Sequence, residues 1–454
     1  MAFSFLPATS VASPRDETLL LEPAASAYRP ARILIHAINF APELIGCGKY
    51  TTELAEFLAR RGHRVDVVTA PPHYPGWRVR APYRAFAYVD EKRGAITVTR
   101  CPMLMNANGG GVWRLLAPLS FALTAAPMVI WRILWFRPDV VMCVEPTLFS
   151  APAALLAAKL VGARSILHVQ DLEVDAAFAV GHLAGTGVRR FANALERSLL
   201  GAFDRVVTIS RKMRAALIAK GVTASQVEVL RNWVDLEAIK PQGRCDVNAF
   251  RAELGIPDDR FVVLYAGHVG VKQALPVLLD AARRLDGDSR IYFVIAGDGP
   301  KKAELQQRYA GLANVLYLPL QPAERLADLL NMADLHVLPQ HKGAADLVMP
   351  SKLGGMLASG RAVVAAAEPG TELFDILQDV ALLVPTGDDA AMADAISRAA
   401  VREDPIRIEN GLRLAASLSS RRLLPRFEAL LLDDRFSAKD VFDARACDPL
   451  DERA

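Results

Sequence analysis

Residues 32–69 read RILIHAINFAPELIGCGKYTTELAEFLARRGHRVDVVT, and their order of apolar and polar positions indicates a strand, a helix and a second strand. Arg32–Ala37 and Val65–Thr69 are apolar runs with the length of buried strands. Between them apolar residues recur at helical spacing until Gly62 ends the helix. Strands that alternate with helices in this way form a parallel sheet covered by helices.

The alternation continues to about residue 230 and then begins a second time. The first series adds predicted strands at Asp139–Val144, Ser165–Val169, Arg205–Ile209 and Val227–Leu230, and Ser210 is the expected N-cap of the helix after the third of them. The second series predicts strands at Phe261–Ala266, Ile291–Ala296, Val315–Leu318, Leu335–Leu338 and Ala362–Ala367. The sequence therefore predicts two α/β domains, 31–233 and 234–432, between a flexible leader, 1–30, and a flexible tail, 433–454.

Composition limits the classes of protein to which this chain can belong. The chain has 454 residues and a net charge of only +3, which argues against a nucleic-acid binder. Its five cysteines are scattered and form no CxxC pair, so we expect neither a zinc nor a redox site. The leader has no charged start followed by an apolar run and a small-residue cleavage site, so we expect a cytoplasmic protein without a signal peptide.

The segment 113–136, WRLLAPLSFALTAAPMVIWRILWF, interrupts the alternation of strands and helices in the first series. Its uncharged core is close to the shortest length that spans a bilayer, and Trp and Arg at both borders suit a membrane interface. Three interpretations remain open: a buried crossover helix with a loop, a patch lying in the plane of a membrane, or a true span. Nearby cations, including Arg93, Arg132 and Arg137, would attract anionic headgroups if they share a face with this segment.

Ligands of open parallel sheets bind beyond the carboxyl ends of the strands, so the loops after the strands are the candidate sites. After the first strand, Gly46, Gly48 and Lys49 open a helix and could bind an anion. Their spacing is neither GxGxxG nor GxxxxGK[ST], which disfavours a dinucleotide site and a P-loop.

Two loops of the second series carry glycines, and one of them also carries a lysine. Gly267 and Lys272 follow the strand at Phe261–Ala266, where the lysine could neutralise a diphosphate. Gly297 begins the tight turn after the next strand, although a turn of this composition also forms without a ligand.

The densest stretch is GAADLVMPSKL at 343–353. A helix that begins at Pro350 would offer Ser351 and Lys352 to phosphate, and a lysine in this place opposes the helix dipole unless an anion is bound. Asp346 precedes them and could accept hydrogen bonds from sugar hydroxyls.

Taken together, GHVGVKQ, GDGP, MADLHVLP, GAADLVMPSKL, LASGRAVV and GTEL resemble the donor domain of family-four GT-B glycosyltransferases. The N-terminal pieces INFAPELIGCGKYTTELAEFLARRGHRVDVVTAPPHYPGW and LHVQDLEVD resemble the colanic-acid-biosynthesis type of exopolysaccharide glycosyltransferase, commonly described as fucosyltransferases. The resemblance covers about residues 31–430.

The resemblance implies an α/β GT-B fold, with two facing Rossmann-like domains and a C-terminal helix that returns towards the N-terminal domain. It also implies retaining transfer of a hexosyl or deoxyhexosyl group from a GDP- or UDP-linked sugar, without a metal or other cofactor. Carried over by position, Gly46, Gly48 and Lys49 would face the donor phosphates, Lys272 and Lys352 would neutralise the diphosphate, and Glu372 would lie near the nucleotide or the sugar.

Two departures from the family pattern affect the site. The family's Glu–seven residues–Glu pattern falls on Leu347 and Gly355, so only Asp346 could replace the first glutamate and the ribose contact is unassigned. A His-Asp pair near the reacting carbon becomes Gln170-Asp171. Asp171 is then the candidate to orient or deprotonate the acceptor, with Gln170 and Glu173 in substrate binding, unless this is only a solvated acidic loop.

A metal-dependent transferase would need a DxD motif, and Asp286–Asp288 precedes a strand, at the wrong end of the sheet. We therefore expect a metal-independent enzyme.

We also expect this enzyme to act at the inner face of the cytoplasmic membrane, with peripheral membrane contact through 113–136. Its expected acceptor is a saccharide linked to polyprenyl diphosphate. Two alternatives remain: a nucleotide-sugar epimerase of the same architecture, and a non-catalytic nucleotide-sugar-binding protein.

Overall fold

The N-terminal sheet of the computed structural model has eight strands in the order β3-β4-β2-β1-β5-β6-β7-β8. The structure describes residues 29–43, 46–74, 76, 78–79, 81–106, 111–146, 148–172, 186–243, 248–342 and 350–432, which leaves the predicted leader and tail largely outside it. The strands are β1 Arg32–His36, β2 Arg64–Thr69, β3 Val89–Arg93, β4 Ile96–Arg100, β5 Val140–Glu145, β6 Arg164–Val169, β7 Arg205–Thr208 and β8 Val227–Val229.

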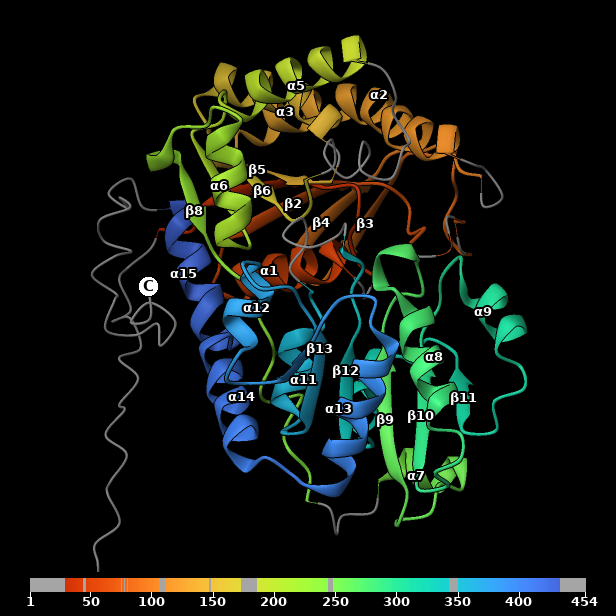
Figure 1. The fold of residues 1–454 in the computed structure, drawn as a ribbon. Coiled ribbons are helices and arrows are strands. Elements are labelled where there is room, and N and C mark those ends of the chain that lie inside the picture. The colour runs from red at the N-terminus through yellow and green to blue at the C-terminus, as the bar shows by residue number, and fades with distance from the viewer. Residues whose placement is uncertain are drawn as a thin grey trace, which may run out of the picture.

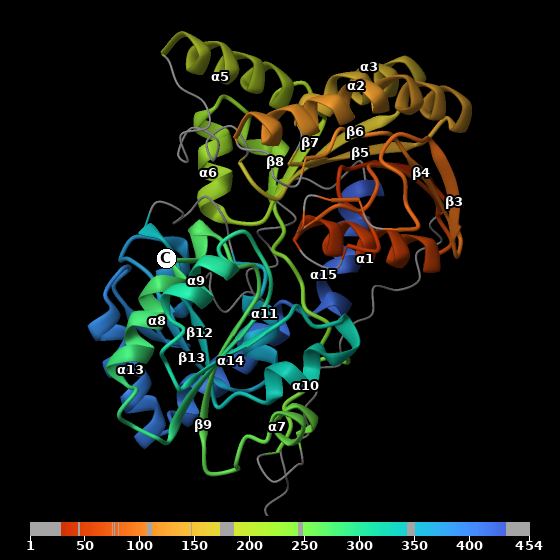
Figure 2. The ribbon, with the colours of Figure 1, turned by 90° about the vertical axis from the view of Figure 1, so that its right-hand side faces the viewer.

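Helices cover both faces of this sheet (Figures 1 and 2). Helices α2 Gly111–Phe136, α3 Ala151–Val161 and α5 Thr186–Leu200 form the outer layer, and α1 Cys47–Arg60 lies on the opposite face, towards the second domain. Helix α6 Arg211–Ala219 begins at the predicted cap, where the Ser210 hydroxyl accepts a hydrogen bond from the Met213 amide at 3.0 Å.

The C-terminal sheet has six strands in the order β11-β10-β9-β12-β13-β14, and all its pairs are parallel. The strands are β9 Phe261–Ala266, β10 Ile291–Ala296, β11 Val315–Leu318, β12 Leu335–Leu338, β13 Ala362–Ala366 and β14 Leu382–Val384. The helices of this domain are α7 Ala249–Leu254, α8 Leu275–Arg284, α9 Lys302–Arg308, α10 Leu326–Asn331, α11 Leu353–Ala358, α12 Glu372–Leu377 and α13 Asp389–Val401.

Three strands, β3, β4 and β14, were not predicted from the sequence. Strand β3 is highly charged and mostly exposed, and it pairs antiparallel with β4, so the N-terminal sheet is not wholly parallel. Strand β14 has only three residues. Neither β3 nor β14 carries the long apolar run from which a buried strand is recognised.

The predicted final helix is two helices, α14 Pro405–Ser417 and α15 Ser420–Leu432. The break lies where the segment that crosses between the two domains, about residues 231–235, pairs with the chain. The Val234 amide donates to the Leu418 carbonyl, and the Ser420 amide donates to the Val234 carbonyl. Helix α15 then returns to the N-terminal domain, as the resemblance implied.

Buried polar groups hold α15 against the N-terminal domain. Glu428 accepts from His63 Nε2 at 2.8 Å and from Arg61 Nε at 3.2 Å. Because His63 Nδ1 accepts a hydrogen bond from the Ala31 amide, the ring hydrogen is on Nε2, which donates it in the hydrogen bond to Glu428.

Helix α2 is one continuous helix with a single buried stripe, made of Ala117, Phe121, Ala125, Val129 and Ile133. These positions repeat every four residues and therefore share one helix face, which packs in the core beneath the outer layer. Within the described residues, Leu116–Phe136 is the one helical stretch that has the length and hydropathy to cross a membrane, and 28% of its most apolar window is buried. In place of the predicted buried crossover helix with a loop, the structure thus has one helix with a buried face and an exposed face.

Candidate active site

The two domains meet at the carboxyl ends of their parallel strands. Asp171 follows β6, Lys272 lies in the loop after β9, and their Oδ2 and Nζ atoms are 3.5 Å apart. Beside this pair, Tyr74 of the N-terminal domain stacks on His268 of the C-terminal domain, with ring centroids 5.9 Å apart. With Lys352, these four residues are called the interdomain site below.

The ammonium of Lys352 is the least compensated charge of the site. It lies 3.6 Å from the centroid of the Tyr265 ring, and among the described residues its Nζ atom has no hydrogen-bond partner. Burial of the ammonium lowers the pKa of Lys352 to about 7. The Tyr265 hydroxyl donates to the His268 carbonyl at 2.6 Å, so Tyr265 links Lys352 to the rest of the site. An enclosed cation without a carboxylate partner is suited to bind an anion.

Asp171 contacts Lys272 with its Oδ2 atom, and its other oxygen is buried. Its Oδ1 atom is buried and has no hydrogen-bond partner in the described part of the chain. Burial raises the pKa of the Asp171 carboxyl, and the charge of Lys272 lowers it. The carboxylate can therefore accept a hydrogen bond from a ligand hydroxyl while Lys272 balances its charge.

The two predicted glycines of the second domain allow two loops to touch. Gly267 has φ +144° and Gly297 has φ +153°, and a Cβ atom on Gly297 would lie 1.8 Å from the Gly267 carbonyl oxygen. A side chain on Gly267 would itself come within 3.7 Å of Lys352 Nζ. These glycines therefore allow the loops after β9 and β10 to pack together next to Lys352.

The glycines of the first loop have different roles. Gly46 is the N-cap of α1 with φ 63°, and a Cβ atom there would meet no atom within 4 Å. A Cβ atom on Gly48 would lie 3.2 Å from the Glu43 Cβ atom, so this glycine is required for packing. Lys49 pairs with Glu53 of its own helix at 3.8 Å, so the structure directs its ammonium along α1.

The buried carboxylate of Glu43 organises this part of the site and was not singled out from the sequence. Its Oε1 atom accepts the His73 and Tyr74 amides at 2.6 and 2.7 Å, and its Oε2 atom accepts from Asn39 Nδ2 at 2.7 Å. Glu43 thereby fixes the backbone of Tyr74 in the interdomain site. A carboxylate inside the otherwise apolar loop FAPELIG was the available signal.

The side chain of Gln170 is bound by other side chains of the protein. Its side-chain amide exchanges two 3.0 Å hydrogen bonds with Asn232 of the crossover and donates to His168 Nε2 at 3.0 Å. Burial lowers the pKa of His168 to about 3, so this imidazole is a neutral acceptor.

Glu372 forms a second link between the domains. Its two oxygens accept from Arg231 Nη2 and from the Lys212 amide, each at 2.8 Å, and Lys212 Nζ donates to the Gly370 carbonyl. Both oxygens therefore contact the N-terminal domain and its crossover in the structure.

Ser351 and Lys352 precede a short helix rather than occupying its first turn. Helix α11 begins at Leu353, and Lys352 is its N-cap residue. The Ser351 side chain is exposed, while its carbonyl accepts the Tyr50 hydroxyl at 3.0 Å. Asp346 and Glu173, which were also predicted for the site, lie outside the described residues.

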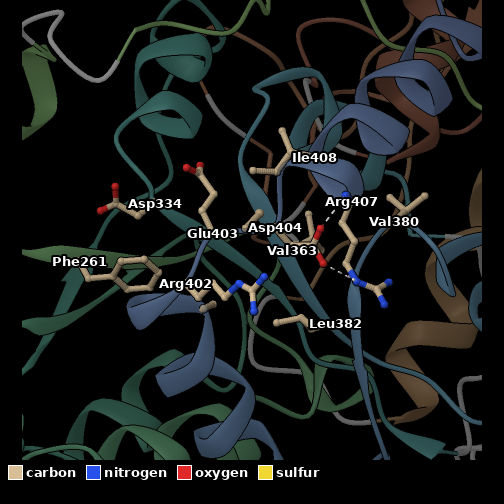
Figure 3. A pocket seen from close by; sticks show the side chains of 12 residues that line it. Phe261, Asp334, Val363, Val380, Leu382, Arg402, Glu403, Asp404, Arg407 and Ile408 are labelled. Carbon is tan, nitrogen blue, oxygen red and sulfur yellow. Dashed lines mark hydrogen bonds and ion pairs between the residues drawn. The ribbon is translucent and has the colours of Figure 1, made fainter.

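A hollow in the C-terminal domain lies at the opposite edge of the sheet (Figure 3). It is lined by residues at the strand beginnings, such as Phe261 and Leu382, and by Arg402 and Arg407. Asp288 of the Asp-Gly-Asp sequence also precedes its strand, β10, where it pairs with Arg290 at 2.7 Å. In the part of the chain that the structure describes, no three His, Cys, Asp or Glu side chains are grouped to hold a metal ion.

Comparisons with known proteins agree with this arrangement. Residues 46–233 match the family described as glycosyl transferase 4-like domain, and residues 260–401 match glycosyl transferases group 1. The chain is 44% identical to the colanic acid biosynthesis glycosyl transferase WcaI of Escherichia coli (strain K12) over 353 residues, which cover 76% of this chain and 86% of that protein.

Solved structures show the same fold. Sucrose-phosphate synthase from Thermosynechococcus elongatus is similar with a TM-score of 0.67 and 18% identity, over 91% of this chain and 100% of that one. HepE of Anabaena, solved in complex with UDP-glucose, gives a TM-score of 0.63 and 16% identity, over 88% of this chain and 98% of that one. The chain therefore belongs to the family-four glycosyltransferases of the GT-B fold, and it is a glycosyltransferase homologous to WcaI.

Proposed function

We propose that this glycosyltransferase moves a hexosyl or deoxyhexosyl group from a GDP- or UDP-linked sugar to a lipid-linked saccharide, with retention of the anomeric configuration, in exopolysaccharide synthesis. The observation that carries the proposal is the pair of ammonium groups, Lys272 and Lys352, at the carboxyl ends of the donor-domain strands. The homology to WcaI supports the polysaccharide context, and the UDP-glucose bound to HepE supports a nucleotide-sugar donor.

The lysines stabilise the leaving group in this proposal. When the bond between the anomeric carbon and the β-phosphate oxygen breaks, its electron pair stays on the nucleoside diphosphate, and Lys272 and Lys352 neutralise the charge that develops there. The acceptor oxygen forms the new bond to the anomeric carbon, and Asp171 accepts the proton of that hydroxyl. Asp346 remains a predicted contact to the sugar hydroxyls.

The function is tested by transfer itself. The purified protein is incubated with UDP- and GDP-hexoses and deoxyhexoses, together with a bacterial lipid extract that contains polyprenyl-diphosphate-linked saccharides. We expect one donor to release its nucleoside diphosphate only when the extract is present, and NMR of the product to show the anomeric configuration of the donor. Conversion of the free donor to its epimer without extract would instead identify an epimerase, and binding without either reaction would identify a non-catalytic protein.

Metal independence follows if the lysines supply the positive charge. We expect transfer to keep at least about half of its rate in excess EDTA, because two ammonium groups replace the divalent cation that bridges the diphosphate in metal-dependent enzymes. The measurement is the initial rate with EDTA and then with added Mg²⁺ or Mn²⁺. Complete loss in EDTA with recovery on adding either metal would contradict the charge assignment.

Membrane contact is proposed through the outer layer of the N-terminal domain. Opposite its buried stripe, α2 exposes large side chains, including Leu123 at 70% and Trp135 at 81%. The neighbouring helix α3 adds Leu156 at 59% and Leu160 at 69%, and the two helices lie side by side on the surface (Figures 1 and 2). A large apolar face with Trp residues suits the headgroup boundary of a bilayer.

A spanning helix fits these contacts less well than an in-plane one. The buried stripe of α2 would have to leave the core of the N-terminal domain before lipid could surround the helix. Of the cations predicted to meet headgroups, Arg132 contacts Asp90 at 2.6 Å and Asp66 at 3.7 Å, and Arg93 contacts Glu56 at 3.0 Å. Both are therefore engaged within the protein.

The contact is tested with vesicles. We expect the protein to co-sediment reversibly with anionic vesicles, less with neutral ones, and less again at high salt, because exposed Arg137 and Lys159 lie next to the apolar face. Leu123→Asp with Trp135→Asp should reduce the bound fraction at least about tenfold, since each places a charge where apolar area was buried.

The matched control is Val401→Asp with Ile406→Asp, two equally exposed apolar residues of the C-terminal domain, at 77% and 71%. This control should bind like the unaltered protein. Equal binding of both double variants would contradict the assignment of the face, and release only by detergent would indicate a span.

A further inference from the structure

The ion pair between Asp171 and Lys272 joins groups that the proposed reaction needs separately. Lys272 belongs to the C-terminal domain and Asp171 to the N-terminal domain, and without a donor each is the other's partner at 3.5 Å. We propose that this pair is an autoinhibitory contact: the donor diphosphate takes Lys272 from Asp171, and only then is the carboxylate basic enough to take the proton of the acceptor hydroxyl. The inference rests on the proposed function of the interdomain site.

The geometry makes the exchange possible. The side chains of Lys272 and Asp171 are 36% and 32% exposed, so a ligand can reach their contact. The backbone of Lys272 is held in place, because its carbonyl accepts the His341 amide at 2.9 Å. The ammonium can therefore change partners by rotation of its side chain while the loop remains fixed.

The energetics favour the donor in this competition. An ion pair with partly exposed partners contributes little, whereas a diphosphate offers several charged oxygens to the same ammonium. Lys352, which has no carboxylate partner among the described residues, binds the same diphosphate and so strengthens its binding relative to the pair with Asp171. The pair is thus strong enough to occupy Asp171 in the free enzyme and weak enough to yield to the donor.

Release of Lys272 also changes the chemistry of Asp171. The charge of Lys272 lowers the pKa of the Asp171 carboxyl, and burial raises it. When the ammonium moves to the diphosphate, its lowering effect on the pKa of Asp171 weakens, so the carboxylate becomes a stronger base. Its Oδ1 atom, which has no partner among the described residues, can then accept a hydrogen bond from the hydroxyl of the acceptor. The donor therefore prepares the base that its own transfer requires.

The proposal is tested by calorimetric titration of UDP and of GDP into the protein, Asp171→Asn, Lys272→Ala and the double variant. We expect Asp171→Asn to bind the preferred nucleoside diphosphate about two- to fivefold more tightly, because Lys272 is no longer shared. In the Lys272→Ala background the same substitution should change the affinity less than about 1.5-fold, since no shared ammonium is left.

The double variant separates this coupling from simple repulsion. If Asp171→Asn tightens binding equally with and without Lys272, the carboxylate only repels the phosphates and the proposal is overturned. Unchanged or weaker binding by Asp171→Asn overturns it as well. If Lys272→Ala leaves the affinity unchanged, the proposed donor site itself is wrong.

Two controls guard against indirect effects. Glu253→Gln breaks a comparably exposed ion pair, between Glu253 of α7 and Arg325 at 2.7 Å, and it should leave the affinity unchanged. Lys272→Gln provides a second variant of the cation should Lys272→Ala fold poorly. It should weaken diphosphate binding and likewise abolish the effect of Asp171→Asn.

Discussion

Replacing Lys352 by alanine or methionine is expected to reduce transfer about 30- to 1,000-fold, which corresponds to about 2–4 kcal/mol of transition-state stabilisation. The ammonium is enclosed above the Tyr265 ring, and no described carboxylate competes for it, so its charge is available to the departing diphosphate. Lys272→Ala should act in the same direction. The measurement is kcat/KM with the preferred donor.

Folding should survive the loss of Lys352, because removing an unpaired buried charge relieves a desolvation cost. Lys301→Met is the control, since this half-exposed lysine pairs with nearby Glu304. Transfer at near-normal rates by both the Lys352 and the Lys272 variants would contradict the assignment of these lysines to the donor phosphates.

The pH dependence gives the same prediction a distinct signature. Because burial lowers the pKa of Lys352 to about 7 in the donor-free enzyme, the lysine is charged below that pH and increasingly neutral above it. A diphosphate binds the charged form, so its affinity should be level below about pH 7 and fall as the pH rises. Lys352→Met should flatten this decline, and an unchanged decline in the variant would assign the titration to another group.

Gly297→Ala is expected to destabilise the protein by more than about 3 kcal/mol or to prevent folding of the C-terminal domain. The added Cβ atom would lie 1.8 Å from the Gly267 carbonyl oxygen, and φ is +153°, so the loops after β9 and β10 would have to separate. Since Gly267 borders Lys352, nucleoside diphosphate binding should be lost together with stability.

The matched control is Gly287→Ala, where an added Cβ atom would meet no atom within 4 Å. Denaturant unfolding of both variants is the measurement, and Gly287→Ala should change the free energy of unfolding by less than about 0.5 kcal/mol. A Gly297→Ala protein as stable as the control would show that the two loops are not packed as described.

Much of the fold could be predicted because a buried parallel strand is a short apolar run. Strand β9, FVVLYA, begins and ends at the residues that the sequence predicts. The charged edge strand β3 could not be recognised in this way, since its stability comes from pairing with β4. The break between α14 and α15 likewise depends on Val234, which is distant in sequence.

The candidate site was likewise only partly predictable from the sequence. Lys272 and Lys352 follow predicted strands or open a predicted helix, so topology alone brings them to one edge of the sheet. The roles of Glu43 and Tyr265 depend on contacts that no local pattern contains, such as the two backbone amides that Glu43 accepts. For Glu372 the family pattern indicated the sugar or nucleotide, whereas the structure adds contacts to Arg231 and Lys212.

The central claim, that a nucleoside diphosphate binds at Lys272 and Lys352, is tested most directly by thermal unfolding with a panel of UDP- and GDP-sugars. A ligand at about 100 times its Kd stabilises the folded protein by about 2.7 kcal/mol, which should raise Tm by about 3 °C for a chain of this length. We expect one nucleotide class to produce this shift in the unaltered protein and in Lys301→Met, and little shift in Lys352→Met. Equal shifts in all three proteins, or no shift with any donor, would contradict the claim.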